Sequence, residues 1–227
     1  MNKHGKRRFR KLKWFLAVLL VLFGLIFIVV LMMLKNPKGY TKPEPIQNDH
    51  VSQYLTNILL PEIYNNAQLG EPFNIVVIQE GVNDIIVRSK WPKKSEGLTF
   101  LPPRVFFVTD NIVLMGTVLF RDTEFVVTIV GAPKIDEQGL LSIKVTKVKI
   151  GAIDITLIAG LIAKKIYQNS IAGKETEQND IGTKIIASLL NNEPFEPIFD
   201  VENEKVRIEN VTLTQKKLIL RLTPLMH

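Results

Sequence analysis

The sequence predicts an α+β domain, dominated by antiparallel β-sheet, that follows one N-terminal transmembrane helix. Three observations support this class. Residues 14–34, WFLAVLLVLFGLIFIVVLMML, contain no charged side chain. Between residues 104 and 150, apolar and alternating runs are separated by turn-type residues, which is typical of consecutive antiparallel strands. Helical patterns precede these runs and also interrupt the predicted strands.

The apolar run is long enough to span a bilayer. Its 21 residues reach about 30 Å at ~1.5 Å per residue. A cleaved signal peptide has a shorter apolar region followed by small residues, whereas Met32-Met33-Leu34-Lys35-Asn36 ends this run. We therefore expect an uncleaved signal anchor over residues 14–34. Seven basic residues precede it and Lys35, Lys38 and Lys42 follow it closely, so the N-terminus is predicted to be cytoplasmic and the rest extracytoplasmic.

Charge is concentrated in the N-terminal arm, residues 1–13. This arm holds seven of the 29 basic residues, and the remaining 22 equal the 22 acidic residues. The body of the protein is neutral, which argues against nucleic-acid binding by the domain. We interpret the arm as a topology signal that also attracts anionic lipid headgroups; a cytoplasmic tail that binds nucleic acid or a partner is the alternative.

Residues 35–47, KNPKGYTKPEPIQ, are predicted to be a linker, and residues 48–227 form one extracytoplasmic domain. A helix should begin at Asn48 or Asp49 and be broken or restarted by Pro61. A strand is expected over 72–78, followed by a short helix in 82–89.

The centre of the chain predicts an antiparallel meander. Its strands are expected within 104–108, 112–120, 124–133 and 140–151, the last with an alternation slip at Thr146 that indicates a bulge. Helices are expected over 155–168 and from about 180 to 191, and two final strands over 206–213 and 218–222.

Signals for catalysis are weak. The three histidines, His4, His50 and His227, lie outside the predicted strands, and no serine has a hydrolase motif. Residues 80–84, EGVND, between a strand and a helix, could hold a metal or phosphate, or could cap the helix through Gln79, Glu80 or Asp84. We expect capping, and we expect neither a catalytic residue nor a metal site nor a cofactor.

The apolar strands are the informative feature. A half-solvated strand alternates, whereas VFFV, IVLMGTVLF and FVVTIV are apolar at adjacent positions and therefore on both faces. Packed helices on both sides, a groove for an acyl chain, or a protein interface at the membrane could each cover them. The residues expected to form the core or line a ligand site are Val105, Phe106, Phe107, Ile112, Leu114, Val118, Phe120, Phe125, Val127 and Ile129.

Two motifs carry a resemblance to a known group. With the order of elements around them, IQEGVNDII at 78–86 and VRIENVTLTQKKLIL at 206–220 resemble membrane-anchored bacterial envelope proteins of the YpmS type. The outline, over residues 48–222, is also similar to the DUF2993 (LmeA-like) lipid-binding group. The resemblance implies a tubular lipid-binding (TULIP-like) fold with a curved sheet, and it supplies no catalytic residue.

Together these features predict a membrane-tethered domain that binds lipid or another apolar ligand without chemical turnover. The alternative function is an envelope scaffold or assembly factor that binds a protein partner and whose apolar strands are simply core.

Overall fold

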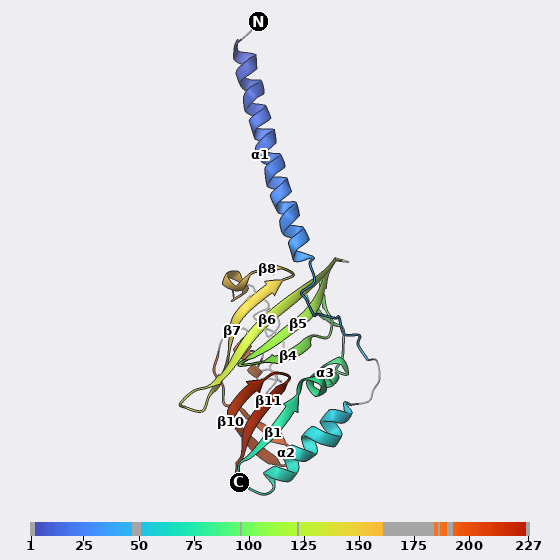
Figure 1. The fold of residues 1–227 in the computed structure, drawn as a ribbon, viewed down its shortest axis with the longest axis vertical. Coiled ribbons are helices and arrows are strands. Elements are labelled where there is room, and N and C mark those ends of the chain that lie inside the picture. Colours follow the sequence, from blue (N-terminus) through green and yellow to red (C-terminus); the bar gives the residue numbers. More distant parts are fainter. Residues whose placement is uncertain are drawn as a thin grey trace.

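The computed structural model describes residues 3–46, 51–95, 97–121, 123–160, 184–185, 187–189 and 193–225. One long helix stands apart from an α+β domain that contains two antiparallel sheets (Figure 1). The predicted class, an apolar N-terminal helix followed by a mostly antiparallel α+β domain, is confirmed. The strands are divided between two sheets, a division that the sequence did not indicate.

Helix α1 (Lys3–Met33) is continuous and projects away from the domain (Figure 1). Its segment Leu12–Met33 has a mean hydropathy of 3.3, and none of its most apolar stretch is buried in the protein. By length and composition this helix can cross a membrane.

The larger sheet has seven strands in the order β2-β3-β5-β6-β7-β8, with β4 also paired to β5. Strands β3 and β4 occupy successive parts of the same edge of β5. Consecutive pairing from β4 to β7 is the predicted meander, and β8 extends it by one short strand. The strands are β2 (Lys93–Ser95), β3 (Leu98–Phe100), β4 (Arg104–Val108), β5 (Asn111–Phe120), β6 (Thr123–Ile135), β7 (Leu141–Ile150) and β8 (Ile153–Asp154).

The bulge predicted at Thr146 is confirmed. Val130 pairs with Lys147 and Gly131 pairs with Val145, so Thr146 has no partner across the ladder. The extra residue returns Val145 to the same face as the apolar residues beyond the bulge.

The smaller sheet has the order β1-β11-β10-β9. The C-terminal hairpin therefore pairs with the first strand of the domain, with Phe73 opposite Leu222. Its core is buried: Val206 and Leu222 are 0% exposed, and they pack with Ile75 and with Ile63 of helix α2 (Leu60–Ala67). The strands are β1 (Phe73–Ile78), β9 (Ile198–Val201), β10 (Glu204–Thr214) and β11 (Lys217–Leu225).

Pro61 restarts the first helix of the domain rather than breaking it. A π-helical turn, η1 (Leu55–Leu59), leads directly into α2 (Leu60–Ala67), and Pro61 lies in the first turn of α2. Proline is tolerated there because its missing N–H would have no partner within that helix.

Helix α3 (Gln79–Val87) closes the free edge of β4 with side-chain amides. Asn83 Nδ2 donates to Val105 O at 2.8 Å, and Asn83 Oδ1 accepts from Val105 N at 2.8 Å. Gln79 Oε1 accepts from Phe107 N at 2.9 Å, and Lys216 N donates to Phe107 O at 3.0 Å. These groups act as a substitute strand and join the two sheets.

The predicted helices after β8 fall largely outside the described residues. Residues 156–160 are helical, as are 184, 185 and 187–189.

Candidate functional site

Strand register sorts the predicted lining residues onto the faces of the large sheet. Residues directly opposite each other in an antiparallel pair share a face. Val105 pairs with Leu114, which pairs with Ile129, and Val118 pairs with Phe125. We name this side the Phe107 face. It carries Val105, Phe107, Ile112, Leu114, Val118, Phe120, Phe125, Val127 and Ile129. Phe106 is opposite Val113 and lies on the other side, which we name the Met115 face.

Burial decreases along the Phe107 face. Val105 and Phe107, at 6% and 3% exposure, are core residues that pack with Leu213 between the sheets. Ile112 and Leu114 pack against this cluster but are only half-buried. The side chains of the Phe107 face are therefore buried at β4 and become more exposed toward the end of β5.

The open end is formed by the β5–β6 hairpin. Val118 and Phe125 are half-buried, and Phe120 is 44% exposed with the Arg121 guanidinium 5.3 Å from its ring centre. Figure 1 places this hairpin at the same end of the domain as the last turn of α1. The helical turn 156–160 follows β8 at that end and exposes 98% of Leu157. Large apolar side chains therefore gather where the domain meets α1.

The opposite, Met115 face is crossed by residues Lys35–Ile46, which we name the strap. The strap has no helix or strand, but hydrogen bonds hold it to the domain. The Tyr40 hydroxyl is 2.8 Å from the Thr117 hydroxyl, and Lys42 Nζ is 2.6 Å from a carboxylate oxygen of Glu124. At its end, Ile46 N donates to Val87 O at 3.2 Å.

The end of α1 is also fixed to the domain. Ala152 N donates to Met32 O at 2.9 Å. Gly151 has a φ of +57°, and an added Cβ there would overlap the carbonyl groups of Met32 and Met33. Only glycine combines this backbone conformation with such a close approach.

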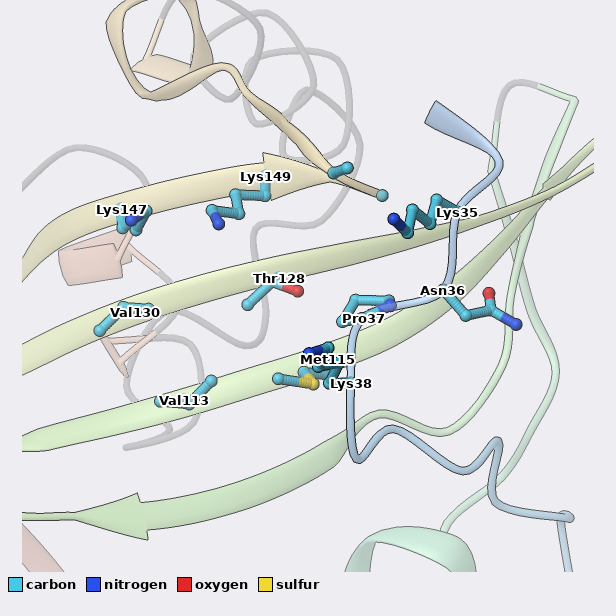
Figure 2. A pocket seen from close by; sticks show the side chains of 12 residues that line it. Lys35, Asn36, Pro37, Lys38, Val113, Met115, Thr128, Val130, Lys147 and Lys149 are labelled. Carbon is cyan, nitrogen blue, oxygen red and sulfur yellow. The ribbon is translucent and has the colours of Figure 1, made fainter. Parts of the chain in front are cut away.

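A cavity of about 400 Å³ lies where the strap crosses β5, β6 and β7 (Figure 2). We name it the strap pocket. Four of its lining side chains are lysines, and the apolar part includes Val113, Met115 and Val130. Thr128 also lines it; this residue is 7% exposed, and its hydroxyl has no hydrogen-bond partner.

Sequence reasoning did not identify the strap pocket. Alternation in β7 places lysines opposite apolar residues, which is the usual pattern of a solvated strand face. Lys147 and Lys149 become pocket walls only because Lys35 and Lys38, more than 100 positions earlier, cross above them. In the sequence, the only indication of this pocket among its lining residues is the two pairs of lysines, Lys35 with Lys38 and Lys147 with Lys149.

The polar motif at 78–86 has a structural role. Helix α3 has no side-chain hydrogen bond at its N-cap, so the predicted capping is wrong. Instead, Asp84 accepts from Ser52 Oγ at 2.5 Å and from Arg88 Nε at 2.8 Å. These hydrogen bonds, from Ser52 first and Arg88 second, lower the pKa of the Asp84 carboxyl. They tie the start of the first helix to α3.

The chemistry available elsewhere is limited. Within the residues that the structure describes, no three His, Cys, Asp or Glu side chains cluster in a way that could hold a metal ion. Asp154 has a lowered pKa, chiefly because it accepts hydrogen bonds from the Thr156 side chain and backbone. The distinctive surfaces are thus the apolar Phe107 face and the lysine-lined strap pocket.

No family model matches the chain, and no curated protein matches its sequence.

Proposed function

We propose that the chain is a single-pass protein of the bacterial cell envelope whose extracytoplasmic domain binds lipid or another apolar ligand without catalysis. The length and hydropathy of α1 support its role as the anchor. The seven basic residues of the N-terminal arm favour a cytoplasmic N-terminus. A curved, TULIP-like sheet, as the resemblance implies, belongs to the same proposal.

The apolar strip on the Phe107 face carries the proposal. It continues from the core at Phe107 to the exposed Phe120, the last residue of β5. The β5–β6 hairpin that follows lies at the end of the domain nearest α1 (Figure 1). From Leu114 to Phe120 it measures about 20 Å at ~3.4 Å per residue. Half of a bilayer's hydrocarbon core is about 15 Å thick. One extended acyl chain therefore fits along the strip.

Energetics favour exchange with the membrane over permanent capture. Each acyl CH2 buried from water contributes ~0.8 kcal/mol. An acyl chain in a bilayer is already out of water, so its transfer to the strip gains little net hydrophobic free energy. The expected gain comes from covering the half-exposed strip itself, and a bound lipid can return to the bilayer.

The test is photocrosslinking of the full chain in lipid nanodiscs with a phospholipid that carries a diazirine in its acyl chain. Crosslinked peptides are mapped by mass spectrometry. We expect labels on residues 112–129 of β5 and β6 as well as on α1. F120N should lower the label on these strands several-fold, because it places a polar group in the strip.

V76N is the matched control. Val76 is 43% exposed on β1 of the other sheet, against 44% for Phe120, so the two variants change exposed apolar surface similarly. Labelling of α1 alone, or an equal effect of V76N, would contradict lipid binding by this face. A folded domain without any label there would favour the scaffold function and a protein partner.

A further inference from the structure

The strap pocket has an excess of positive charge inside a neutral domain. Lys35 and Lys38 contribute from the strap, and Lys147 and Lys149 from β7 (Figure 2). Within the described part of the chain, none of these four ammonium groups forms an ion pair. Asp154 lies opposite Lys149 in the sheet and interacts electrostatically with Lys147 and Lys149, but its carboxylate already accepts hydrogen bonds from Thr156.

Topology and helix capping do not explain these lysines. Basic residues that orient a span act on the cytoplasmic side, whereas this group follows the other end of α1. A cation near the C-terminus of a helix is favourable, which accounts for Lys35. It does not account for Lys147 and Lys149 on β7, which reach the same cavity from the sheet.

Thr128 contributes an unpaired hydroxyl group to the same pocket. The residue is more than nine-tenths buried and lines the pocket, and its hydroxyl oxygen is buried without a hydrogen-bond partner. The great majority of buried side-chain polar atoms in proteins have a hydrogen-bond partner. In Figure 2 this hydroxyl points toward Pro37, where the strap passes over the sheet. A ligand oxygen in the pocket would give it a partner.

We propose that the strap pocket binds the phosphate headgroup of an anionic phospholipid from the membrane leaflet that α1 leaves. The lysine ammonium groups and the Thr128 hydroxyl contact phosphate oxygens, and the start of an acyl chain lies on Met115 and its apolar neighbours. Lys35 and Lys38 follow Met33, the last residue of α1, by two and five positions, which places the pocket at headgroup level. This inference shares the anchoring role of α1 with the proposed function, but it does not depend on the Phe107 face.

The experiment measures lipid binding to the full chain by native mass spectrometry in detergent. Phosphatidylglycerol and phosphatidylcholine with identical acyl chains are titrated separately. The wild-type protein should bind phosphatidylglycerol more tightly. K147Q/K149Q should raise its dissociation constant roughly 10- to 30-fold, the product of about fivefold per lysine at an anionic membrane surface, and leave the phosphatidylcholine value unchanged.

K134Q/K144Q is the matched control, because Lys134 and Lys144 are exposed on the same face of β6 and β7 but do not line the pocket. Its affinity for phosphatidylglycerol should stay within about twofold of the wild type. An equal loss of phosphatidylglycerol affinity in the two double variants would show that overall charge attracts the lipid, and it would overturn the proposed headgroup site. Absence of any preference for phosphatidylglycerol would overturn it too.

T128V removes the hydroxyl at nearly constant shape. It should weaken phosphatidylglycerol binding while thermal stability is kept, and unchanged binding would overturn the assignment. Inorganic phosphate is the competitor: displacement at the same concentration as the lipid would identify a soluble anion and refute the lipid assignment. F120N should retain headgroup selectivity, so failure of the proposed function and failure of this inference are distinguishable.

Discussion

Replacing Asn83 by alanine removes three hydrogen bonds at the joint between α3 and β4. Two of them satisfy the N–H and C=O of Val105, and the third, at 3.0 Å, joins Asn83 Nδ2 to Gln79 O. Val105 is 6% exposed, so water has poor access to its freed groups. A buried backbone group without a partner costs about 1–3 kcal/mol.

The N83A variant should therefore lose roughly 2–5 kcal/mol of unfolding free energy. For a domain of this size, that corresponds to a fall in melting temperature of about 5–15 °C. Thermal unfolding of the full chain in detergent, followed by the β-sheet signal in circular dichroism, measures the change.

N66A provides the control for this experiment. Asn66 makes one local hydrogen bond on an exposed helix surface, to Glu62 O at 2.7 Å. Its replacement should cost no more than about 0.5 kcal/mol. A difference of about 0.5 kcal/mol corresponds to a shift of 1–2 °C in melting temperature. If N83A melts within that range of N66A, the Asn83 hydrogen bonds do not stabilise the contact between α3 and β4, and their proposed role is refuted.

Three further predictions concern contacts around α1 and the helices. G151A should push the last turn of α1 away from β8 and accelerate hydrogen exchange at the Ala152 amide more than tenfold; unchanged exchange would show that the two are not in contact. The folded-state pKa of Asp84 lies below its ordinary value of 3.8, so its stabilising effect is present above pH 3.8 and is lost as the pH falls through the folded value. D84N should abolish this part of the acid dependence, and identical acid unfolding curves would argue against it. Y40F leaves the Thr117 hydroxyl unpaired, which should cost about 1–3 kcal/mol and speed proteolysis within 35–46; equal cleavage rates would indicate a strap that is already free.

Local patterns predicted much of the large sheet. The strands β4 to β7 and the bulge at Thr146 follow from apolar runs, turn residues and one slip in alternation. The short strands β2, β3, β8 and β9 were missed, because runs of two to four residues such as KKS and ID are too short to show a period. Pairing of β1 with β11 was missed because it joins residues almost 150 positions apart, and nothing in either strand encodes its partner.

The candidate surfaces were predictable to different degrees. The sequence named ten lining residues but left their face undetermined, because a shift of one residue in register exchanges the faces. The observed register places nine of them on one face and Phe106 on the other. Whether that face holds a ligand stays a prediction. The strap pocket was not predictable, because it depends on where an irregular segment crosses the sheet, and the position of Thr128 beneath it appears only in three dimensions.

The attachment of the strap also limits the reach of the domain. A free chain as long as residues 35–46 would have a root-mean-square span of about 20 Å and would let the domain tumble above its anchor. The contacts at Met32, Tyr40, Lys42 and Ile46 remove this freedom. The domain and α1 then move as one body, so a membrane crossed by α1, as we propose, would always meet the same edge of the domain. A ligand site on that edge would then stay at one distance from the membrane surface.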